Sequence, residues 1–211
     1  MNKDSPKTVK SRGRPPRSDQ DVAKTRQRIA DCALRLFQAE GYEAVSMRRL
    51  AQEAGCTVMT LYRHFDAKID ILRQIWRNVF AELFDQLDAR AEQEADPIER
   101  LNAVALGYVE FWLARRDRYF LVFMSSGVSQ DDVSVFVADD DLLLRFNVLQ
   151  ESLIAALNAT GSEADPVLRN QVLMCSLNGI AHNLITISAF PWADPEALVR
   201  QAVLGTLRDD A

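Results

Sequence analysis

The fold is decided by residues 46–68, which read SMRRLAQEAGCTVMTLYRHFDAK. The first half places apolar side chains at i, i+3, i+4 and i+7, namely at Met47, Leu50, Ala51 and Ala54. Gly55 interrupts this pattern, and a second inward stripe follows at Val58, Leu61 and Phe65. Ser46 and Thr57 stand just before the two patterns, and both are preferred N-cap residues. The spacing therefore predicts two short helices joined by a glycine turn, which is a helix-turn-helix.

A longer amphipathic segment precedes these two helices. One face of residues 20–40 carries Val22, Arg26, Ile29, Ala33, Leu36 and Phe37 at helical spacing. Gly41 follows and is suited to the left-handed conformation that ends many helices, while Ser18 or Asp19 offers an oxygen to cap the start. Residues 19–66 therefore predict a three-helix unit.

The exposed side chains of this unit have the chemistry of DNA contacts. In a helix-turn-helix the second helix enters the major groove while the first crosses the backbone, so basic groups, hydroxyls and methyl-sized apolar groups are expected there. The predicted contacts are Ser46, Arg48, Arg49, Thr57, Val58, Met59, Thr60, Tyr62, Arg63, His64 and Lys68. We expect His64 to be among the more exposed of them. For each charge taken alone, a solvated surface position is the alternative.

Charge is divided unevenly along the 211 residues, although the formal net charge is only −5. Residues 1–68 hold 14 Lys and Arg against 8 Asp and Glu, a balance of +6. Residues 69–211 hold 11 against 22, a balance of −11. A basic head and an acidic body are therefore expected, with the positive charge placed where phosphate would be met.

The first 18 residues are strongly basic, with six Lys and Arg, three prolines and one acidic residue. This composition is typical of a disordered tail. Its centre, Arg12-Gly13-Arg14-Pro15, resembles the core of an AT-hook, in which the arginines lie in the minor groove of A·T-rich DNA. We expect Arg12 and Arg14 to contact DNA, and a merely solubilising tail is the alternative.

Further blocks of sequence accompany the helix-turn-helix. They are Thr25-Arg26-Gln27-Arg28-Ile29, Leu36-Phe37, Gly41-Tyr42, Ser46-Met47-Arg48-Arg49-Leu50-Ala51, Ala54-Gly55 and Thr60-Leu61-Tyr62-Arg63-His64-Phe65, followed by Lys68. Over about residues 22–72 the chain resembles the DNA-binding domain of the TetR (AcrR) family. The resemblance implies phosphate contacts by Ser46, Tyr62 and Lys68, and base contacts by Val58, Met59 and Thr60. Cys56 and Met59 replace the Val and Gly often found there, which affects the expected operator sequence.

The remaining residues, 67–211, predict helices only. An apolar stripe runs from Ile69 to Leu87 in a helix that ends near residue 94, and Asp66 can cap its start. Prolines, glycines and acidic residues divide the rest into helices near 97–115, 117–126, 139–158, 166–189 and 195–208. We therefore predict an all-α protein of about nine helices, with an N-terminal DNA-binding domain and a C-terminal ligand-binding and dimerisation domain.

The last two helices have features of a dimer interface. The helix near 166–189 is apolar around most of its circumference, so we expect it to be covered on several sides. Its small or amide residues and those of the last helix are Ser176, Gly179, Asn183, Leu198, Ala202 and Gly205. A core within one chain is the alternative, and the family resemblance implies a homodimer through a four-helix bundle.

Aromatic and polar side chains in the body indicate a binding cavity for a small molecule. The candidates are Tyr108, Phe111, Trp112, Tyr119, Phe120, Phe123, Met124, Phe146 and Met174, joined by Asn178 and His182 on an otherwise apolar helix. Aromatic residues at helical spacing also form ordinary cores, and a hydrogen-bonded core histidine is the alternative for His182.

Several protein classes are disfavoured. No GxSxG, P-loop, HExxH or dinucleotide motif is present, so neither an enzyme, a cofactor nor a metal site is expected. No apolar run reaches the ~18 residues that span a bilayer. Cys32, Cys56 and Cys175 are unpaired in pattern, and we expect each to be a small buried side chain in a reducing, cytoplasmic protein.

These observations together predict a ligand-responsive transcriptional regulator, most simply a repressor. It would bind a double-stranded, pseudo-palindromic operator as a homodimer and be released by a small, apolar or aromatic inducer. The alternative is a ligand-independent, architectural DNA-binding dimer.

Overall fold

The computed structural model describes residues 19–137, 145 and 147–208, and this part of the chain forms ten helices and no strand. The helices are α1 Asp19–Glu40, α2 Met47–Glu53, α3 Val58–Tyr62, α4 Lys68–Gln93, α5 Pro97–Ala114, α6 Arg116–Phe123, α7 Gln130–Val137, α9 Asn147–Thr160, α10 Pro166–Thr186 and α11 Pro195–Leu207. The all-α prediction is confirmed. The predictions for the basic tail, including Arg12 and Arg14, and for Phe146 lie outside the described residues.

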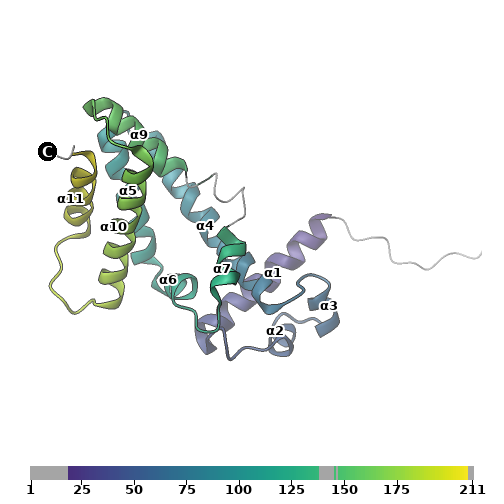
Figure 1. Ribbon diagram of the computed structural model, residues 1–211. Helices are drawn as coiled ribbons and strands as arrows, with labels where there is room; N and C mark the ends of the chain where they lie inside the picture. Colours follow the sequence, from purple (N-terminus) through teal and green to yellow (C-terminus); the bar gives the residue numbers. More distant parts are fainter. Residues whose placement is uncertain (1–18, 138–144, 146, 209–211) are drawn as a thin grey trace, which may run out of the picture.

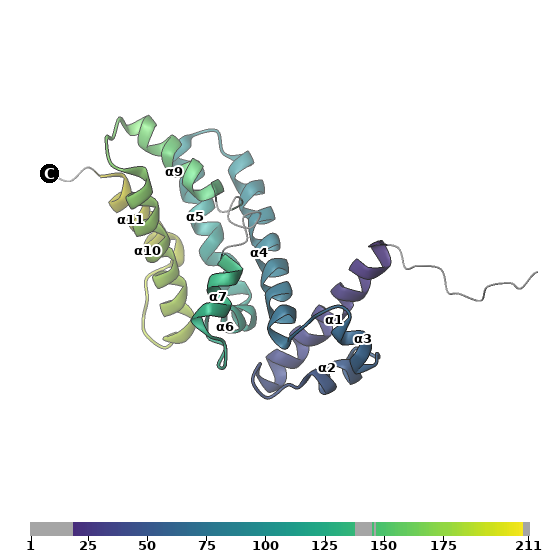
Figure 2. The same cartoon turned by 45° about the vertical axis from the view of Figure 1, so that its right-hand side comes forward.

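Helices α1–α3, called the head below, lie at one end of the molecule, and α4 runs from them into the remaining helices, called the body (Figure 1). The body contains α4–α7 and α9–α11, with α10 and α11 on the side away from the head in both views (Figure 2). The two glycine stops predicted in the head are confirmed, because Gly41 and Gly55 have φ angles of 84° and 62°. The helix that links the two parts, α4, has 26 residues and is about 39 Å long.

The start of α4 differs from the prediction that Asp66 caps it. The N-cap residue is Ala67, whose side chain cannot accept a hydrogen bond. Instead, the Ala67 amide donates to Oδ2 of Asp70 at 3.0 Å, so a carboxylate inside the first turn satisfies the free amide. Asp66 and Asp70 both lie close to the start of α4, and a carboxylate at either position could accept a hydrogen bond from a free amide. The sequence pattern therefore did not distinguish them.

An additional helix, α7, occupies a region that was predicted as a break before a helix at 139–158. Ser129 and Asp132 form a reciprocal capping arrangement at its start. The Ser129 amide donates to Oδ2 of Asp132 at 3.1 Å, and the Asp132 amide donates to Oγ of Ser129 at 3.2 Å. The Ser-x-x-Asp spacing of these two residues is a local sequence signal for this helix start. The predicted helix 139–158 is observed as α9, and residues 138–144 and 146 lie outside the described part.

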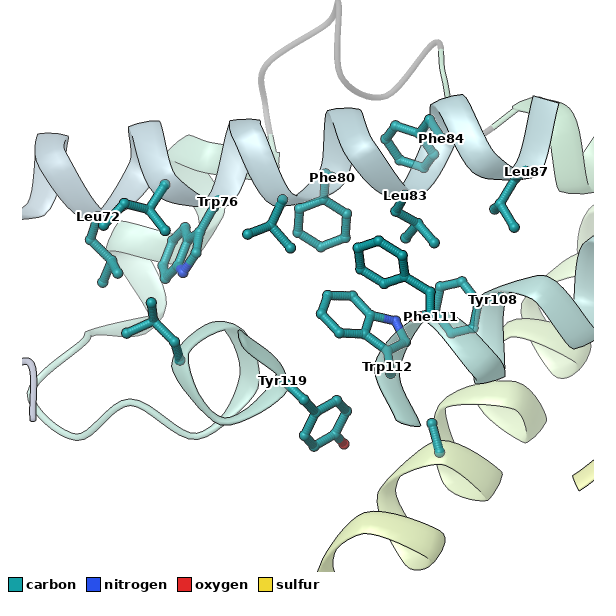
Figure 3. Packing of buried hydrophobic residues seen from close by; sticks show 14 of the residues in the cluster. Leu72, Trp76, Phe80, Leu83, Phe84, Leu87, Tyr108, Phe111, Trp112 and Tyr119 are labelled. Carbon is teal, nitrogen blue, oxygen red and sulfur yellow. The ribbon is translucent and has the colours of Figure 1, made fainter. Parts of the chain in front are cut away.

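The body core is centred on Trp112 of α5, whose side chain is completely buried. Edge-to-face contacts surround its ring, with centroid distances of 5.0 Å to Phe111, 5.8 Å to Tyr119 and 5.9 Å to Phe80 (Figure 3). The Phe123 ring makes a further contact of this kind at 5.1 Å. Such arrangements place the positive ring edge against a negative ring face. The cluster joins α4, α5 and α6 in one core.

The three cysteines differ in exposure. Cys32 is buried and Cys56 is partly buried, but Cys175 on α10 is exposed, so the expectation of a buried side chain is wrong for Cys175. It lies on a face of α10 that this single chain does not cover.

Among the residues that the structure describes, no helix is both long enough and apolar enough to cross a membrane.

Replacing Trp112 with alanine is expected to lower the free energy of unfolding by about 3–5 kcal/mol, because a large cavity would form between three helices. Urea denaturation followed by circular dichroism measures this loss. Phe123→Ala serves as the control, because the Phe123 side chain touches the same ring but is 42% exposed. Equal losses in the two variants would contradict the central position of Trp112.

Candidate nucleic-acid interface

The helix-turn-helix begins each of its short helices with a side-chain cap. Oγ of Ser46 accepts a hydrogen bond from the Arg49 amide at 3.1 Å, and Oγ1 of Thr57 accepts one from the Thr60 amide at 3.1 Å. Both caps were predicted, and both are confirmed. The hydroxyls of Thr57 and Thr60 also lie 2.9 Å apart. Two hydroxyl groups are therefore gathered at the N-terminal end of α3, where a recognition helix contacts base edges.

The inner face of α3 is anchored to the rest of the head. Leu61 is fully buried and Phe65 nearly so. Arg26 of α1 donates to the carbonyl oxygen of His64, and its guanidinium carbon lies 4.2 Å from the centroid of the Phe65 ring. This cation–π contact and hydrogen bond attach the C-terminal end of α3 to α1. Sequence spacing placed Arg26 on the inner face of α1 but did not reveal this role.

The outer face of α3 exposes large side chains. Met59 is 70% exposed, Tyr62 48% and Val58 37%. The assignment of Val58 to the inward stripe is therefore wrong, because a five-residue helix turns only Leu61 fully toward the core. Apolar groups that are grouped and exposed on one short helix indicate a contact surface. Base contacts by Val58, Met59 and Thr60 remain predictions.

His64 departs from its expected exposure. The residue is only 8% exposed, because α3 ends at Tyr62 and the chain then tightens, with the His64 amide donating to the Leu61 carbonyl at 3.0 Å. This turn directs the imidazole into the head. The expectation that His64 is among the exposed residues is wrong, and the burial weakens it as a phosphate contact.

Lys68 stands at the first position of α4 and is held from several sides. Its ammonium donates to the carbonyl oxygens of Tyr42 at 2.8 Å and Glu43 at 3.2 Å, and lies 4.3 Å from the centroid of the Tyr42 ring. Burial lowers the pKa of Lys68, and the nearby Glu43 carboxylate opposes this change. An ammonium has three donors, so one is left for an external acceptor such as phosphate.

The predicted arginine contacts fall into two groups. Arg49 is engaged within the head, with nitrogen–oxygen distances of 3.2 Å to Glu40 and 2.9 Å to Glu53. Arg48 and Arg63 are exposed, and neither forms a hydrogen bond or ion pair within the described part of the chain. The freely available cations are therefore Arg48 and Arg63, whereas Arg49 would have to leave its carboxylate partners to reach phosphate.

The predicted pocket residues of the body are largely core. Tyr108, Phe111 and Trp112 are buried against one another, whereas Phe123 and Met124 are 42% and 51% exposed, and Met174 is partly buried. This arrangement follows the core alternative for the first three residues. The structure thus separates one buried set of aromatic residues from a second, exposed set at the end of α6.

The two polar residues on α10 each meet a tyrosine. The Tyr108 hydroxyl donates to Oδ1 of Asn178 at 2.6 Å, and the Tyr119 hydroxyl lies 3.0 Å from Nδ1 of His182. Burial raises the pKa of the Tyr108 and Tyr119 hydroxyls, so both are protonated at neutral pH. His182 is therefore a hydrogen-bonded histidine of the body, as the alternative proposed. The two tyrosine pairs attach α10 to α5 and α6.

The outer faces of α10 and α11 are open in this single chain. Val167, Leu168 and Val172 of α10 and Leu204 of α11 are 45–57% exposed. A Cβ atom added to Gly179 or Gly205 would meet nothing within 4 Å. Ser176 and Asn183 donate to carbonyl oxygens of their own helix, and Leu198 and Ala202 are partly buried. As expected, α10 is covered on several sides, by α5, α9 and α11, but one further face stays open within this single chain.

The capped and anchored pair α2–α3, with its exposed α3 face, defines the class of a helix-turn-helix DNA-binding protein. The model for "Bacterial regulatory proteins, tetR family" matches residues 29–75. Residues 29–75 of the chain therefore carry a DNA-binding domain of the TetR (AcrR) type.

Comparisons with known proteins give relatives of the same kind. The chain is 30% identical to the transcriptional regulator AcrR of Shigella flexneri over 107 residues, and this stretch covers 50% of each chain. It is 38% identical to the repressor KstR of Mycobacterium tuberculosis over 77 residues, which cover 36% of this chain and 35% of KstR. The chain thus spans half or less of the length of these two relatives. The regulator FadR of Bacillus subtilis, solved in complex with stearoyl-CoA, shares the fold with a TM-score of 0.70, at 16% identity over 86% of this chain and 97% of FadR.

Replacing Thr57 with alanine is expected to lower the free energy of unfolding by about 1 kcal/mol, because the Thr60 amide would lose its cap. Chemical denaturation measures the change. Thr57→Ser keeps the oxygen and should remain within about 0.5 kcal/mol of the parent. If serine is as damaging as alanine, the hydroxyl does not act as the cap.

Proposed function

We propose that this protein is a homodimeric transcriptional repressor that binds a pseudo-palindromic, double-stranded operator through α3 and is released by a small-molecule inducer. The observation that carries the proposal is the two-sided character of α3, whose inner face is anchored by Arg26, Leu61 and Phe65 while its outer face exposes Met59 and Tyr62. A short helix held rigidly with large side chains exposed is suited to major-groove contact. Because its partner is chromosomal DNA, we place the protein in the cytoplasm.

Within this proposal, the contacts divide into two kinds. The available cations Arg48, Arg63 and the remaining donor of Lys68 would position the head on phosphates. The hydroxyl of Thr60 and the side chains of Val58 and Met59 would read base edges, with apolar atoms suited to a thymine methyl group. Phosphate contacts raise affinity for every sequence, whereas base contacts decide between sequences.

Dimerisation through α10 and α11 is supported by their exposed outer faces. Four apolar side chains and two glycines that leave space for close approach occupy these faces. Two helices from each of two copies would form a four-helix bundle, and the two-fold axis would match a pseudo-palindromic site. The two heads would then meet successive major grooves about 34–36 Å apart.

The inducer part of the proposal depends on the body. The exposed rings and thioether at the end of α6, and the tyrosine-bound Asn178 and His182, offer apolar and polar groups near one another. The neighbour FadR was solved with a ligand that has a long apolar tail, which supports the capacity of this fold to hold one. The close packing around Trp112 favours the alternative, a ligand-independent DNA-binding dimer. Release of bound DNA by an added small molecule would exclude that alternative.

The test of DNA recognition begins with selection of bound fragments from sheared genomic DNA by the purified protein. On a selected fragment, Thr60→Ala should lose affinity mainly for the selected sequence, so the ratio of specific to random binding falls by about tenfold, as loss of a base contact would cause. Lys68→Ala should weaken both duplexes alike and reduce the salt dependence of binding by about one ion. Fluorescence anisotropy at several salt concentrations measures both quantities.

The division into base and phosphate contacts would be contradicted if Thr60→Ala and Lys68→Ala changed the affinities for specific and random duplexes in the same way. If Thr60→Ala weakens specific and random duplexes equally, Thr60 does not read a base. If no fragment is enriched by the parent protein, the proposed recognition of an operator is wrong.

The dimer is tested by Val172→Arg, which places a charge on the exposed face of α10. The variant should sediment as a monomer at micromolar concentration and keep its helix content, because Val172 is 48% exposed and contributes little to its own chain's core. Sedimentation equilibrium measures the mass. Val133→Arg on α7 is the matched control, since Val133 is 42% exposed and its helix α7 lies apart from α11 in Figures 1 and 2. Dissociation of both variants, or of neither, would contradict the proposed interface.

A further inference from the structure

A cleft of about 630 Å³ lies between the head and the body. The head contributes the C-terminal end of α1 and the loop to α2, and the body contributes α6 and the residues after it. Figures 1 and 2 place α6 at the end of the body that faces the head. The volume is in the range of sites that hold drug-sized molecules. The cleft is separate from the aromatic cluster around Trp112 and from the outer surface of α3.

The charge of the cleft has one sign. Three carboxylates from three different segments line it, those of Glu40 on α1, Glu43 in the loop and Asp117 on α6. No lysine, arginine or histidine of the described chain is among its lining residues. The C-terminal carbonyl groups of α1 add partial negative charge at the same place. The cleft therefore favours a cation and disfavours an anion.

The neighbouring cations leave much of this charge uncompensated. Arg49 pairs with Glu40, with both side chains 39% exposed. The Lys68 ammonium is bound to main-chain carbonyl groups and lies near the Glu43 carboxylate without forming an ion pair with it. Neither Glu43 nor Asp117 forms an ion pair in the described part of the chain. Asp117 accepts a hydrogen bond from Nε2 of Gln38 at 2.5 Å, which joins the body to the head across the cleft. Two carboxylates on opposite sides are thus available to a cationic ligand.

The cleft also has an apolar side. Phe120 and Met124 of the body line it and are 44% and 51% exposed, so their apolar atoms are open to a molecule in the cleft. Phe37 and Tyr42 line the head side and stack edge-to-face at 5.2 Å. Aromatic faces attract cations, and a thioether adapts to irregular apolar groups.

We propose that this cleft is a binding site for amphipathic organic cations, in which the positive centre lies between Glu43 and Asp117 and the apolar groups lie against Phe120 and Met124. Because its walls come from both head and body, the ligand would contact both at once and favour the arrangement of the two that the structure shows. This site shares Met124 with the proposed inducer site, but its walls are α1, the loop after α1 and α6 rather than α10, and it is separate from the proposed DNA surface.

The test uses two probes that have nearly the same shape and opposite charge, tetraphenylphosphonium and tetraphenylborate. Isothermal titration calorimetry on the full chain, without DNA, should show binding of the phosphonium and at least about tenfold weaker binding of the borate, because charge is the only large difference between them. Equal binding of the two probes would overturn the proposal. The measurement needs no operator, so a failure of the proposed DNA recognition would leave its result unaffected.

The site is located with the double variant Glu43→Gln and Asp117→Asn, which removes two charges and keeps the shape and the acceptor for Gln38. Phosphonium affinity should fall about fivefold or more, as expected for the loss of two partly exposed charge contacts. The matched control is Glu151→Gln with Glu163→Gln, which removes the same net charge from exposed positions outside the cleft.

The outcomes separate the cleft from other sites. Weakening in the cleft variant alone supports the proposal, and equal weakening in both double variants shows only attraction to net charge and overturns it. Ser126→Arg adds a cation to the cleft wall at an exposed position and should also weaken phosphonium binding. Unchanged phosphonium affinity in that variant and in the cleft double variant would place the probe elsewhere.

Discussion

The contact of Arg26 with the end of α3 is the interaction on which the proposed DNA surface depends. A helix of five residues cannot be stable alone, because nucleation costs more than one turn of hydrogen bonds returns. The Thr57 cap holds the first turn, and Arg26 attaches the last one through the His64 carbonyl and the Phe65 ring. With both ends held, the exposed side chains of α3 present one defined surface rather than an ensemble of positions.

The long helix α4 carries that surface to the body. Ion pairs connect α4 to three other parts of the chain, since Glu82 pairs with Arg115 and Arg118, Arg73 with Asp132, and Arg145 with Asp85 and Asp88. These side chains are partly exposed, so each pair contributes little to the free energy of folding. Their main effect is to favour one alignment of α4 with the segments beside it. The buried stripe that includes Leu83 and Phe84 supplies most of the attachment through apolar burial. The head–body cleft lies beside this connection, where α6 meets α1.

Local signals in the sequence predicted the head well, and the exceptions have local causes. Caps and glycine stops act within a few residues, so Ser46, Thr57 and Gly41 could be assigned correctly. His64 and Val58 were placed on the wrong side because α3 is shorter than its apolar spacing suggests. In the body, α7 was missed although Ser129 and Asp132 carry a capping signal, and the exposure of Cys175 depends on which face of α10 a single chain covers.

The sequence by itself determined the all-helical class, the helix-turn-helix, its two caps and the contrast between basic residues 1–68 and acidic residues 69–211. These properties follow from periodicity, capping and charge, which operate between near neighbours in the chain. Only the tertiary structure decided the partners of Lys68, Asn178 and His182, and the meeting of Gln38 with Asp117 that closes the head onto the body. Those contacts join residues 25 to 79 positions apart, and their distances are set by how whole helices pack.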